Sequence, residues 1–367
     1  MRPRFSVCIA GAVLLARSLT SGPAYYSDAG RHLQAIADHT FVIQPPGYWL
    51  FNRVGGLFAD PELGLLILNW CFSALGCVAF YACARRLVRS PLARLGTVLY
   101  ATAFFAWFSG NVHSTYASQL LFPPLMFYFI LRFQESPQTQ WLLGVAASFA
   151  LGAGFRPSDG VFLAPLLLLF ALQLSRKHQL MLLASVSILC LAWLIPNRIA
   201  LHRYSPIGHA EQLTHAATGA IVLGRINAYT ISNAFRFFLP LVVALGPTAW
   251  FISRARDAVA RQLWAWVLPG SAFFLLVFIS DAPYLDCLLG GFVLLCLLGM
   301  NACRNRVVPV VALTFSIVVN VLFFTGFHQL PPQNAVSAVI DRDLGLYTLD
   351  AVRHQTRLRL IDVIKAQ

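Results

Sequence analysis

Residues 27–51 hold a concentration of ionisable side chains that is found almost nowhere else in the first half of the chain. The stretch reads SDAGRHLQAIADHTFVIQPPGYWLF and holds two aspartates, one arginine and two histidines next to long apolar runs. Carboxylates and imidazoles can exchange protons, and a guanidinium can bind an anion. Two interpretations are open: the stretch is a solvated loop with an aspartate at a helix N-terminus, or it carries a chemical site.

The pattern within this stretch predicts a short amphipathic helix that lies on a membrane surface. Ser27 can cap a helix that begins at Asp28, where the helix dipole favours an ionised carboxylate. Apolar residues recur at helical spacing against a polar face: Ala29, Leu33, Ile36 and Ala37 against Arg31, His32 and Asp38. A Pro-Pro-Gly turn at 45–47 then breaks the chain. The next segment, YWLFNRVGGLF, is expected to be interfacial too, since its Tyr48 and Trp49 suit the headgroup layer.

Composition indicates that these residues belong to a membrane protein. Of the 367 residues 58% are hydrophobic and only 11% are charged, and the mean hydropathy is +0.68, which leaves too little polar surface for a soluble globule. The net charge of +13 lies largely in short connections between apolar runs, where it sets topology, so we expect membrane lipids and no nucleic acid as partners. The eight cysteines fall in or beside apolar runs and are expected to be small buried hydrophobes.

The apolar runs predict about 11 transmembrane helices, because a spanning helix needs about 20 mostly apolar residues. The runs lie near 5–20, 63–83, 92–109, 116–132, 139–155, 159–174, 179–197, 234–253, 263–280, 284–301 and 307–326. We therefore expect an all-α polytopic membrane protein with interfacial helices in its first outer loop. Residues 1–326 would form the transmembrane domain, and residues 327–367 an outward-facing tail.

The basic connections predict which helix ends face the cytoplasm. They follow every second run and contain Arg85, Arg86, Arg89 and Arg94; Arg132; Arg176 and Lys177; Arg254, Arg256 and Arg261; Arg304 and Arg306. The positive-inside rule then gives a cytoplasmic N-terminus in an inner (plasma) membrane. A cleaved signal peptide is the alternative for the first run, but Arg17 and the lack of an Ala-x-Ala site favour an uncleaved helix. Almost all carboxylates and histidines fall outside, which indicates chemistry at the outer surface and argues against an ion-coupled pump.

Residues 25–51 resemble the first outer loop of the C-type glycosyltransferase superfamily, in particular its protein O-mannosyltransferase and lipid A aminoarabinose transferase branch (glycosyltransferase family 39). In that branch an aspartate just outside the first helix opens an interfacial helix, and a Pro-Pro followed by an aromatic residue leads to the second span. The turns GNVHSTYAS (110–118) and GFRPSDG (154–160) resemble the next two outer turns of the family. The similarity covers residues 1–175.

The resemblance implies an inverting membrane glycosyltransferase, a hexosyl- or pentosyltransferase, that moves a sugar from a polyprenyl-phosphate donor to a protein, lipid or glycan acceptor on the outer face. Asp28 would be the catalytic general base that removes the acceptor's proton. A phosphate leaves without an acid, so arginines would bind it on the leaving side. The residues expected to bind substrate are Arg31, His32, Gln44, Pro46, Tyr48, His113, Tyr116, Arg156 and Arg225. Relatives often have Asp-Glu where Ala29 follows Asp28, so no acidic pair supports a divalent metal, and no cofactor is expected.

Several alternatives remain at this point. The chain as a whole can also be read as a transporter or flippase of a lipid-linked saccharide, or as a non-catalytic membrane assembly subunit. His113 and Tyr116 can be interfacial anchors, and Arg156 can pair with Asp159 to order a turn. The histidines of the 198–233 segment match no metal-binding motif and are expected to be solvated.

Overall fold

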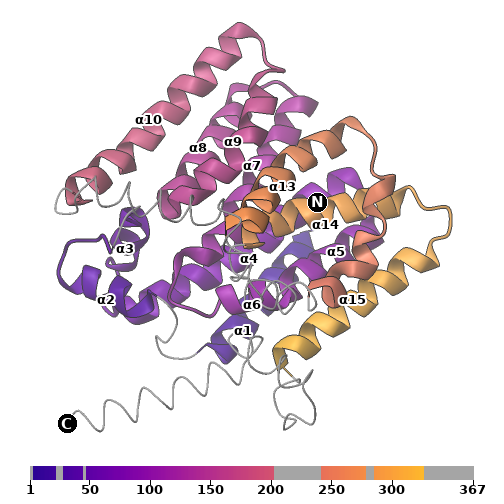
Figure 1. The fold of residues 1–367 in the computed structure, drawn as a ribbon, viewed down its shortest axis with the longest axis horizontal. Helices are drawn as coiled ribbons and strands as arrows, with labels where there is room; N and C mark the ends of the chain where they lie inside the picture. Colours follow the sequence, from indigo (N-terminus) through magenta and orange to yellow (C-terminus); the bar gives the residue numbers. More distant parts are fainter. Residues whose placement is uncertain (1–2, 22–27, 44–46, 202–240, 278–284, 326–367) are drawn as a thin grey trace.

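The computed structural model describes residues 3–21, 28–43, 47–201, 241–277 and 285–325, and within these ranges it is helical, with no strand. The elements are α1 (Pro3–Thr20), α2 (Ala29–Ala37), α3 (Trp49–Gly55), α4 (Pro61–Leu87), α5 (Ser90–Thr102), α6 (Phe104–Ser109), η1 (Thr115–Ala117), α7 (Ser118–Glu135), α8 (Thr139–Phe155), α9 (Pro157–Ala171), α10 (Arg176–Ala200), η4 (Ile252–Arg254), α13 (Ala258–Val277), α14 (Asp286–Asn301) and α15 (Val307–Thr325). The short helices α2 and α3 lie at one end of the bundle, opposite the turn between α9 and α10 (Figure 1). The predicted tail, 327–367, lies outside the described residues.

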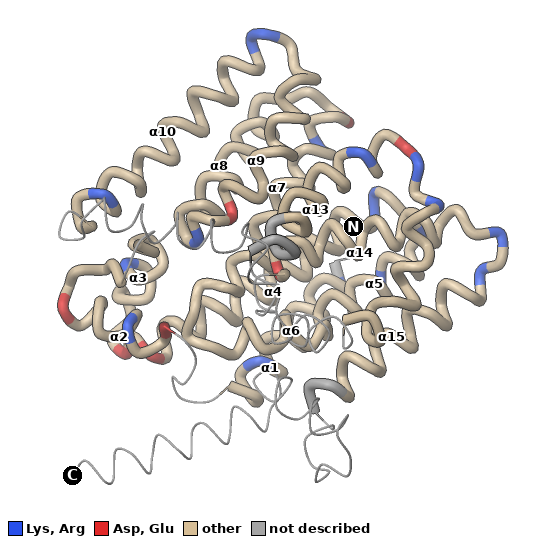
Figure 2. Tube along the Cα trace, viewed as in Figure 1, with Lys and Arg blue, Asp and Glu red and all other residues tan. Residues whose placement is uncertain are grey.

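Many of the predicted apolar runs correspond to helices, several of which are shorter than a full span. By length and composition α4 and α10 are long and apolar enough to cross a membrane, and α8, α9, α14, Leu241–Arg254 and Val307–Leu322 are shorter apolar helices. Lysines and arginines gather at the α9–α10 turn and near the start of α13, whereas a group of acidic residues lies around α2 (Figure 2). The α9–α10 turn therefore lies at the basic end of the bundle, and α2 lies at the acidic end.

Helix α4 begins and ends on the residues that local physics favours. The side chain of Asp60 accepts hydrogen bonds from the backbone N–H groups of Glu62 and Leu63, at 3.0 and 3.2 Å, and Pro61 occupies the first turn. Arg85 and Arg86 stand in the last turn, where the helix dipole favours positive charge. These signals orient α4 from the acidic end to the basic end.

Helix α4 packs against α7 through a close backbone approach. A Cβ on Gly76 would lie 2.3 Å from the carbonyl oxygen of Leu120, so a larger residue would push α7 away. The same carbonyl has no partner within α7, because Pro124 lacks the N–H that would reach it. The hydroxyl of Tyr100 donates to it instead, at 2.6 Å. A freed carbonyl inside a membrane needs such a partner, so Tyr100 stabilises the proline-containing stretch of α7.

The predicted run 92–109 is wrong as a single helix, because the chain breaks between α5 and α6. Ala103 has an extended backbone (φ −52°, ψ 122°), and Phe104 starts a new helix. The side chain of Asn320, from α15, accepts a hydrogen bond from the Phe104 N–H at 3.0 Å and donates to the carbonyl of Ala244 at 3.3 Å. The break is thus capped by a residue distant in sequence.

Candidate active site

The catalytic residue predicted from the sequence, Asp28, is the N-cap residue of α2 at the acidic end of the bundle. Helix α2 itself starts at Ala29, one residue later than predicted. The Asp28 carboxylate accepts no capping hydrogen bond from α2, and its Oδ1 lies 3.2 Å from Nη1 of Arg31. The two side chains are 25% and 63% exposed, and an exposed pair of this kind contributes little to stability. The pair can therefore open when a ligand arrives.

His32 lies on the buried face of α2, which corrects its predicted place on the polar face. Its ring packs edge-on against Tyr48 and Phe51, with centroids 5.7 and 5.1 Å away. Its Nδ1 lies 2.6 Å from Oδ1 of Asn52. The helical periodicity could not show this, because the partner that makes burial of an imidazole acceptable comes from α3. Conversely Ala37, predicted on the apolar face, is exposed.

The Asn52 side chain determines which nitrogen of the His32 imidazole carries the proton. Its amide nitrogen donates to the carbonyl of Phe41 at 3.0 Å, so its oxygen is the atom that faces His32. Nδ1 of His32 is therefore the protonated nitrogen, and Nε2 is a hydrogen-bond acceptor. Burial is the main cause that lowers the pKa of His32 to about 4; the Asn52 hydrogen bond opposes this shift, and the positive charge of Arg156 adds to it. The imidazole is neutral at neutral pH, and the positive charge of Arg156 acts on it electrostatically.

The loop between α2 and α3 has an unusual backbone. His39, Phe41 and Tyr48 have positive φ angles of 53°, 58° and 60°, a conformation that costs energy for residues with a side chain. Gly47 has φ +114°, and a Cβ there would lie 2.1 Å from the side-chain oxygen of Asn197. That oxygen accepts from the backbone N–H of Trp49 at 3.3 Å. The far end of α10 thus holds the α2–α3 loop in a strained shape beside the site.

Arg156 lies between α8 and α9 and is nearly completely buried. Its guanidinium contacts the hydroxyl of Thr115 (3.3 Å), the hydroxyl of Ser158 (3.1 Å) and Oδ1 of Asp159 (3.7 Å). It also stacks over the ring of Tyr116, 4.3 Å from the centroid. The predicted pairing of Arg156 with Asp159 is present. A buried, oriented guanidinium of this kind can bind an anion that displaces part of its shell.

His113 and Tyr116 are buried rather than placed as interfacial anchors. The turn that carries them is held against α4 by Asn69, whose amide nitrogen donates to the carbonyls of Val112 (2.6 Å) and Ser114 (2.9 Å). His113 Nε2 lies 3.8 Å from a carboxylate oxygen of Glu62. The turn therefore forms one wall of the interior next to Arg156.

Two buried carboxylates near Arg156 were not predicted as site residues. Asp159 accepts from the amide of Gln119 at 2.6 Å, and its second oxygen has no partner within the described chain. Asp286 is the first residue of α14 and is buried beside Ser109, within the fields of Arg156 and Arg17. A signal for Asp286 exists in the sequence, since it is an acidic residue at the start of an otherwise apolar run. For Gln119 the only signal is one amide at the start of the run 116–132.

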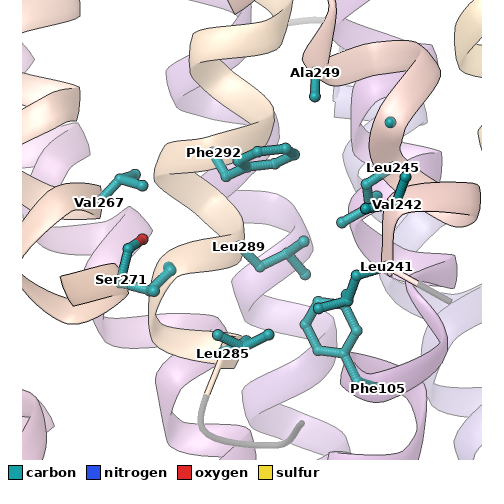
Figure 3. A pocket seen from close by; sticks show the side chains of 12 residues that line it. Phe105, Leu241, Val242, Leu245, Ala249, Val267, Ser271, Leu285, Leu289 and Phe292 are labelled. Atoms are coloured by element: carbon teal, nitrogen blue, oxygen red, sulfur yellow. The ribbon is translucent and has the colours of Figure 1, made fainter. Parts of the chain in front are cut away.

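An apolar cavity of about 290 Å³ adjoins this buried group (Figure 3). It lies between α6, α13, α14 and the helical stretch Leu241–Arg254. Its walls are almost entirely hydrocarbon, with Ser271 as the polar exception: Phe105, Leu241, Leu245, Leu285, Leu289 and Phe292. Leu285 directly precedes Asp286, so the cavity runs along α14 from the level of the buried carboxylate.

Three predicted substrate-binding residues, Gln44, Pro46 and Arg225, lie outside the described residues. Of the others, the structure gathers His113, Tyr116 and Arg156 into one buried group and places His32 within the field of Arg156. Asp28, Arg31 and Tyr48 belong to the α2–α3 segment at the edge of this group.

Comparison with known proteins gives one family match and two similar crystal structures. Residues 38–199 match the family described as dolichyl-phosphate-mannose-protein mannosyltransferase. The crystal structure of ArnT from Cupriavidus metallidurans bound to undecaprenyl phosphate superposes with a TM-score of 0.63 at 14% identity, covering 98% of this chain and 79% of ArnT. The chain therefore has the fold of ArnT. The apo structure of the same ArnT superposes with a TM-score of 0.60 at 15% identity, covering 95% of this chain and 76% of ArnT.

The comparisons confirm the expected fold, an all-α polytopic membrane protein. The family match begins at residue 38, so Asp28 and helix α2 lie outside it. The exact number of spans stays a prediction. No curated protein sequence matches the chain.

Proposed function

We propose that the chain is a membrane glycosyltransferase that takes a sugar from a polyprenyl-phosphate donor. The observation that carries the proposal is that the α2–α3 segment, which starts beside Asp28, packs next to the buried Arg156: Ile36 and Phe51 share one hydrophobic cluster with Phe155, the residue before Arg156. The shared fold supports it, since ArnT with this fold binds undecaprenyl phosphate. The adjoining apolar cavity is suited to an isoprenoid chain.

The proposed reaction is an inverting transfer. The acceptor's hydroxyl oxygen bonds to the anomeric carbon while the bond from that carbon to the phosphate oxygen breaks, and its electron pair leaves with the phosphate. Asp28 takes the proton of the hydroxyl. Arg31 and Arg156 bind the phosphate oxygens, where guanidinium groups stabilise the growing charge. His32 and Tyr48, with Gln44 and Pro46, border the sugar, and Arg225 is a further phosphate ligand.

The proposal includes no metal ion. Ala29 follows Asp28, so this position offers one carboxylate, and no group of three histidine, cysteine or acidic side chains gathers in the ranges that the structure describes. Charge on the leaving phosphate is then balanced by arginines alone. The acceptor is a protein, lipid or glycan hydroxyl at the outer face.

The test is transfer by the purified protein. Membranes of a strain lacking the gene supply both the unused lipid-linked donor and the unmodified acceptor, and detergent-solubilised protein is expected to join them, as seen by mass spectrometry of the acceptor. Within the described residues, the buried charges Arg17, Asp159 and Asp286 favour a transporter of lipid-linked saccharides. A transporter needs two leaflets and gives no product in detergent, so absence of product with intact donor would contradict the transferase.

The proposed orientation places α2 outside and the α9–α10 turn in the cytoplasm, because the basic connections lie at the latter end (Figure 2). A membrane-impermeant thiol reagent is expected to label Ala37→Cys in intact cells and to label Ser175→Cys only after the cells are opened. Both positions are exposed on the protein or close to its surface. The unmodified chain, with its eight cysteines, gives the baseline. Labelling in the opposite order would place the candidate site on the wrong side for an outer-leaflet donor.

A further inference from the structure

A second cavity opens at the basic end of the bundle, far from Asp28. Its volume is about 470 Å³, and it lies between the ends of α7 and α9 and the start of α13. Its walls combine polar and apolar side chains: Gln134, Gln173, Arg261 and Gln262 with Leu169 and Val259. The proposed reaction uses none of these residues.

The three glutamines of this cavity form a hydrogen-bonded group. The side-chain oxygen of Gln173 accepts from the amide nitrogens of both Gln134 (3.4 Å) and Gln262 (3.3 Å). Both of these bonds end on the oxygen of Gln173, so its amide nitrogen can donate to a ligand in the cavity. Gln262 is 4% exposed, and its own buried oxygen has no partner in the part of the chain that the structure describes. An unpaired buried acceptor costs free energy unless a ligand donates to it.

The charge at the cavity is positive. Arg261 makes no ion pair within the described ranges. The two carboxylates of this end are already engaged: Glu135 bonds to Arg86 and to Arg132, each at 3.1 Å, and Asp257 caps α13 through the Ala260 N–H at 2.7 Å. The cavity therefore offers a cation and several N–H donors to an anion, and one acceptor to a hydroxyl.

We propose that this cavity binds the headgroup of an anionic phospholipid that carries a free hydroxyl, such as phosphatidylglycerol. The phosphodiester contacts Arg261 and the amide of Gln173, and the headgroup hydroxyl donates to the buried oxygen of Gln262. Leu169 and Val259 form the apolar wall along which the acyl chains enter. The site lies where α9 ends and α13 begins, which is the headgroup level of the basic face. The bound lipid would join α13 to α7 and α9.

Native mass spectrometry of the purified full-length protein tests this site. We expect one phosphatidylglycerol to be retained in preference to phosphatidylcholine, and Arg261→Gln to weaken its binding about tenfold or more, as for loss of a charge-assisted hydrogen bond. Arg256→Gln removes the same charge from an exposed residue five positions earlier that does not line the cavity, and it should leave binding unchanged. Equal weakening in both variants would mean general attraction to a basic surface and would overturn the site.

Two further arms separate the headgroup from other anions. Gln262→Met keeps the volume and removes the acceptor, so it should abolish the preference for phosphatidylglycerol over phosphatidylmethanol, which has the same charge and no hydroxyl. An unchanged preference would contradict the role of Gln262. Inorganic phosphate at millimolar concentration should not displace the lipid. Displacement by phosphate alone would assign the cavity to a free anion and overturn the lipid proposal.

Discussion

Asp28→Asn is expected to lower the rate of sugar transfer by about 10²–10⁴-fold, the usual contribution of a general base. Asparagine has nearly the size of aspartate and is as good an N-cap residue, so α2 should form as before. The exposed contact with Arg31 contributes little to stability. The amide cannot take the acceptor's proton. Donor binding and the thermal midpoint in detergent should therefore stay near those of the parent while turnover is lost.

The matched control for Asp28 is Asp38→Asn. Asp38 is the C-cap residue of the same helix, is exposed, and stands ten residues later, so it tests loss of a carboxylate from α2 without loss of the proposed base. It should transfer sugar at the parental rate. Transfer by Asp28→Asn within about threefold of the parent is too small for a lost base and would leave Asp28 as a helix cap. A loss only in Asp38→Asn would move the base to that residue.

Arg156→Lys is expected to weaken donor use by about tenfold or more, because lysine keeps the charge and loses the planar fork that meets a phosphate with two hydrogen bonds. The stacking of the guanidinium on Tyr116 and its contact with Thr115 would also be lost. The measurements are the binding constant for undecaprenyl phosphate and kcat/KM for the donor. Arg132→Lys is the control, since Arg132 stacks on Trp141 in the same way, at 4.5 Å, but at the basic end.

The contact between Arg156 and Asp159 allows a sharper comparison. If Arg156 only orders the turn through this pair, Asp159→Asn and Arg156→Lys should lower the thermal midpoint alike and leave donor binding unchanged. If Arg156 binds phosphate, Arg156→Lys should weaken donor binding, whereas Asp159→Asn should not weaken it. The amide that Asp159→Asn introduces can keep a hydrogen bond with Gln119 through its oxygen, which limits the structural damage of that variant.

The sequence predicted the helices well where one local signal dominates. The run 139–155 coincides with α8, and Asp60, Pro61 and the terminal arginines mark the ends of α4. The break at Ala103 could not be predicted, because the group that caps Phe104 comes from a residue 216 positions away. The residues on both sides of this break are mostly apolar, so the hydropathy pattern does not mark it.

For the candidate site, the sequence identified residues but not their surroundings. The turns at 110–118 and 154–160 were singled out separately, and the structure joins them through Arg156, Thr115 and Tyr116. The predicted face of His32 was wrong, since amphipathic periodicity treats histidine as polar and cannot include a bond to Asn52. The sequence does not distinguish the buried carboxylates Asp159 and Asp286 from solvated loop carboxylates, because their burial results from tertiary packing.

The capping of Phe104 by Asn320 has a consequence for biosynthesis. Helices α5 and α6 are synthesised before α15. The hydrogen bond from the Phe104 N–H to Asn320 can therefore form only after the 216 residues up to Asn320 have been added to the chain. Until then the α5–α6 elbow lacks the hydrogen bond that Asn320 accepts in the folded chain. Nascent chains halted before residue 320 should therefore expose this elbow to proteases, and insertion of α15 would close it as a late step of maturation.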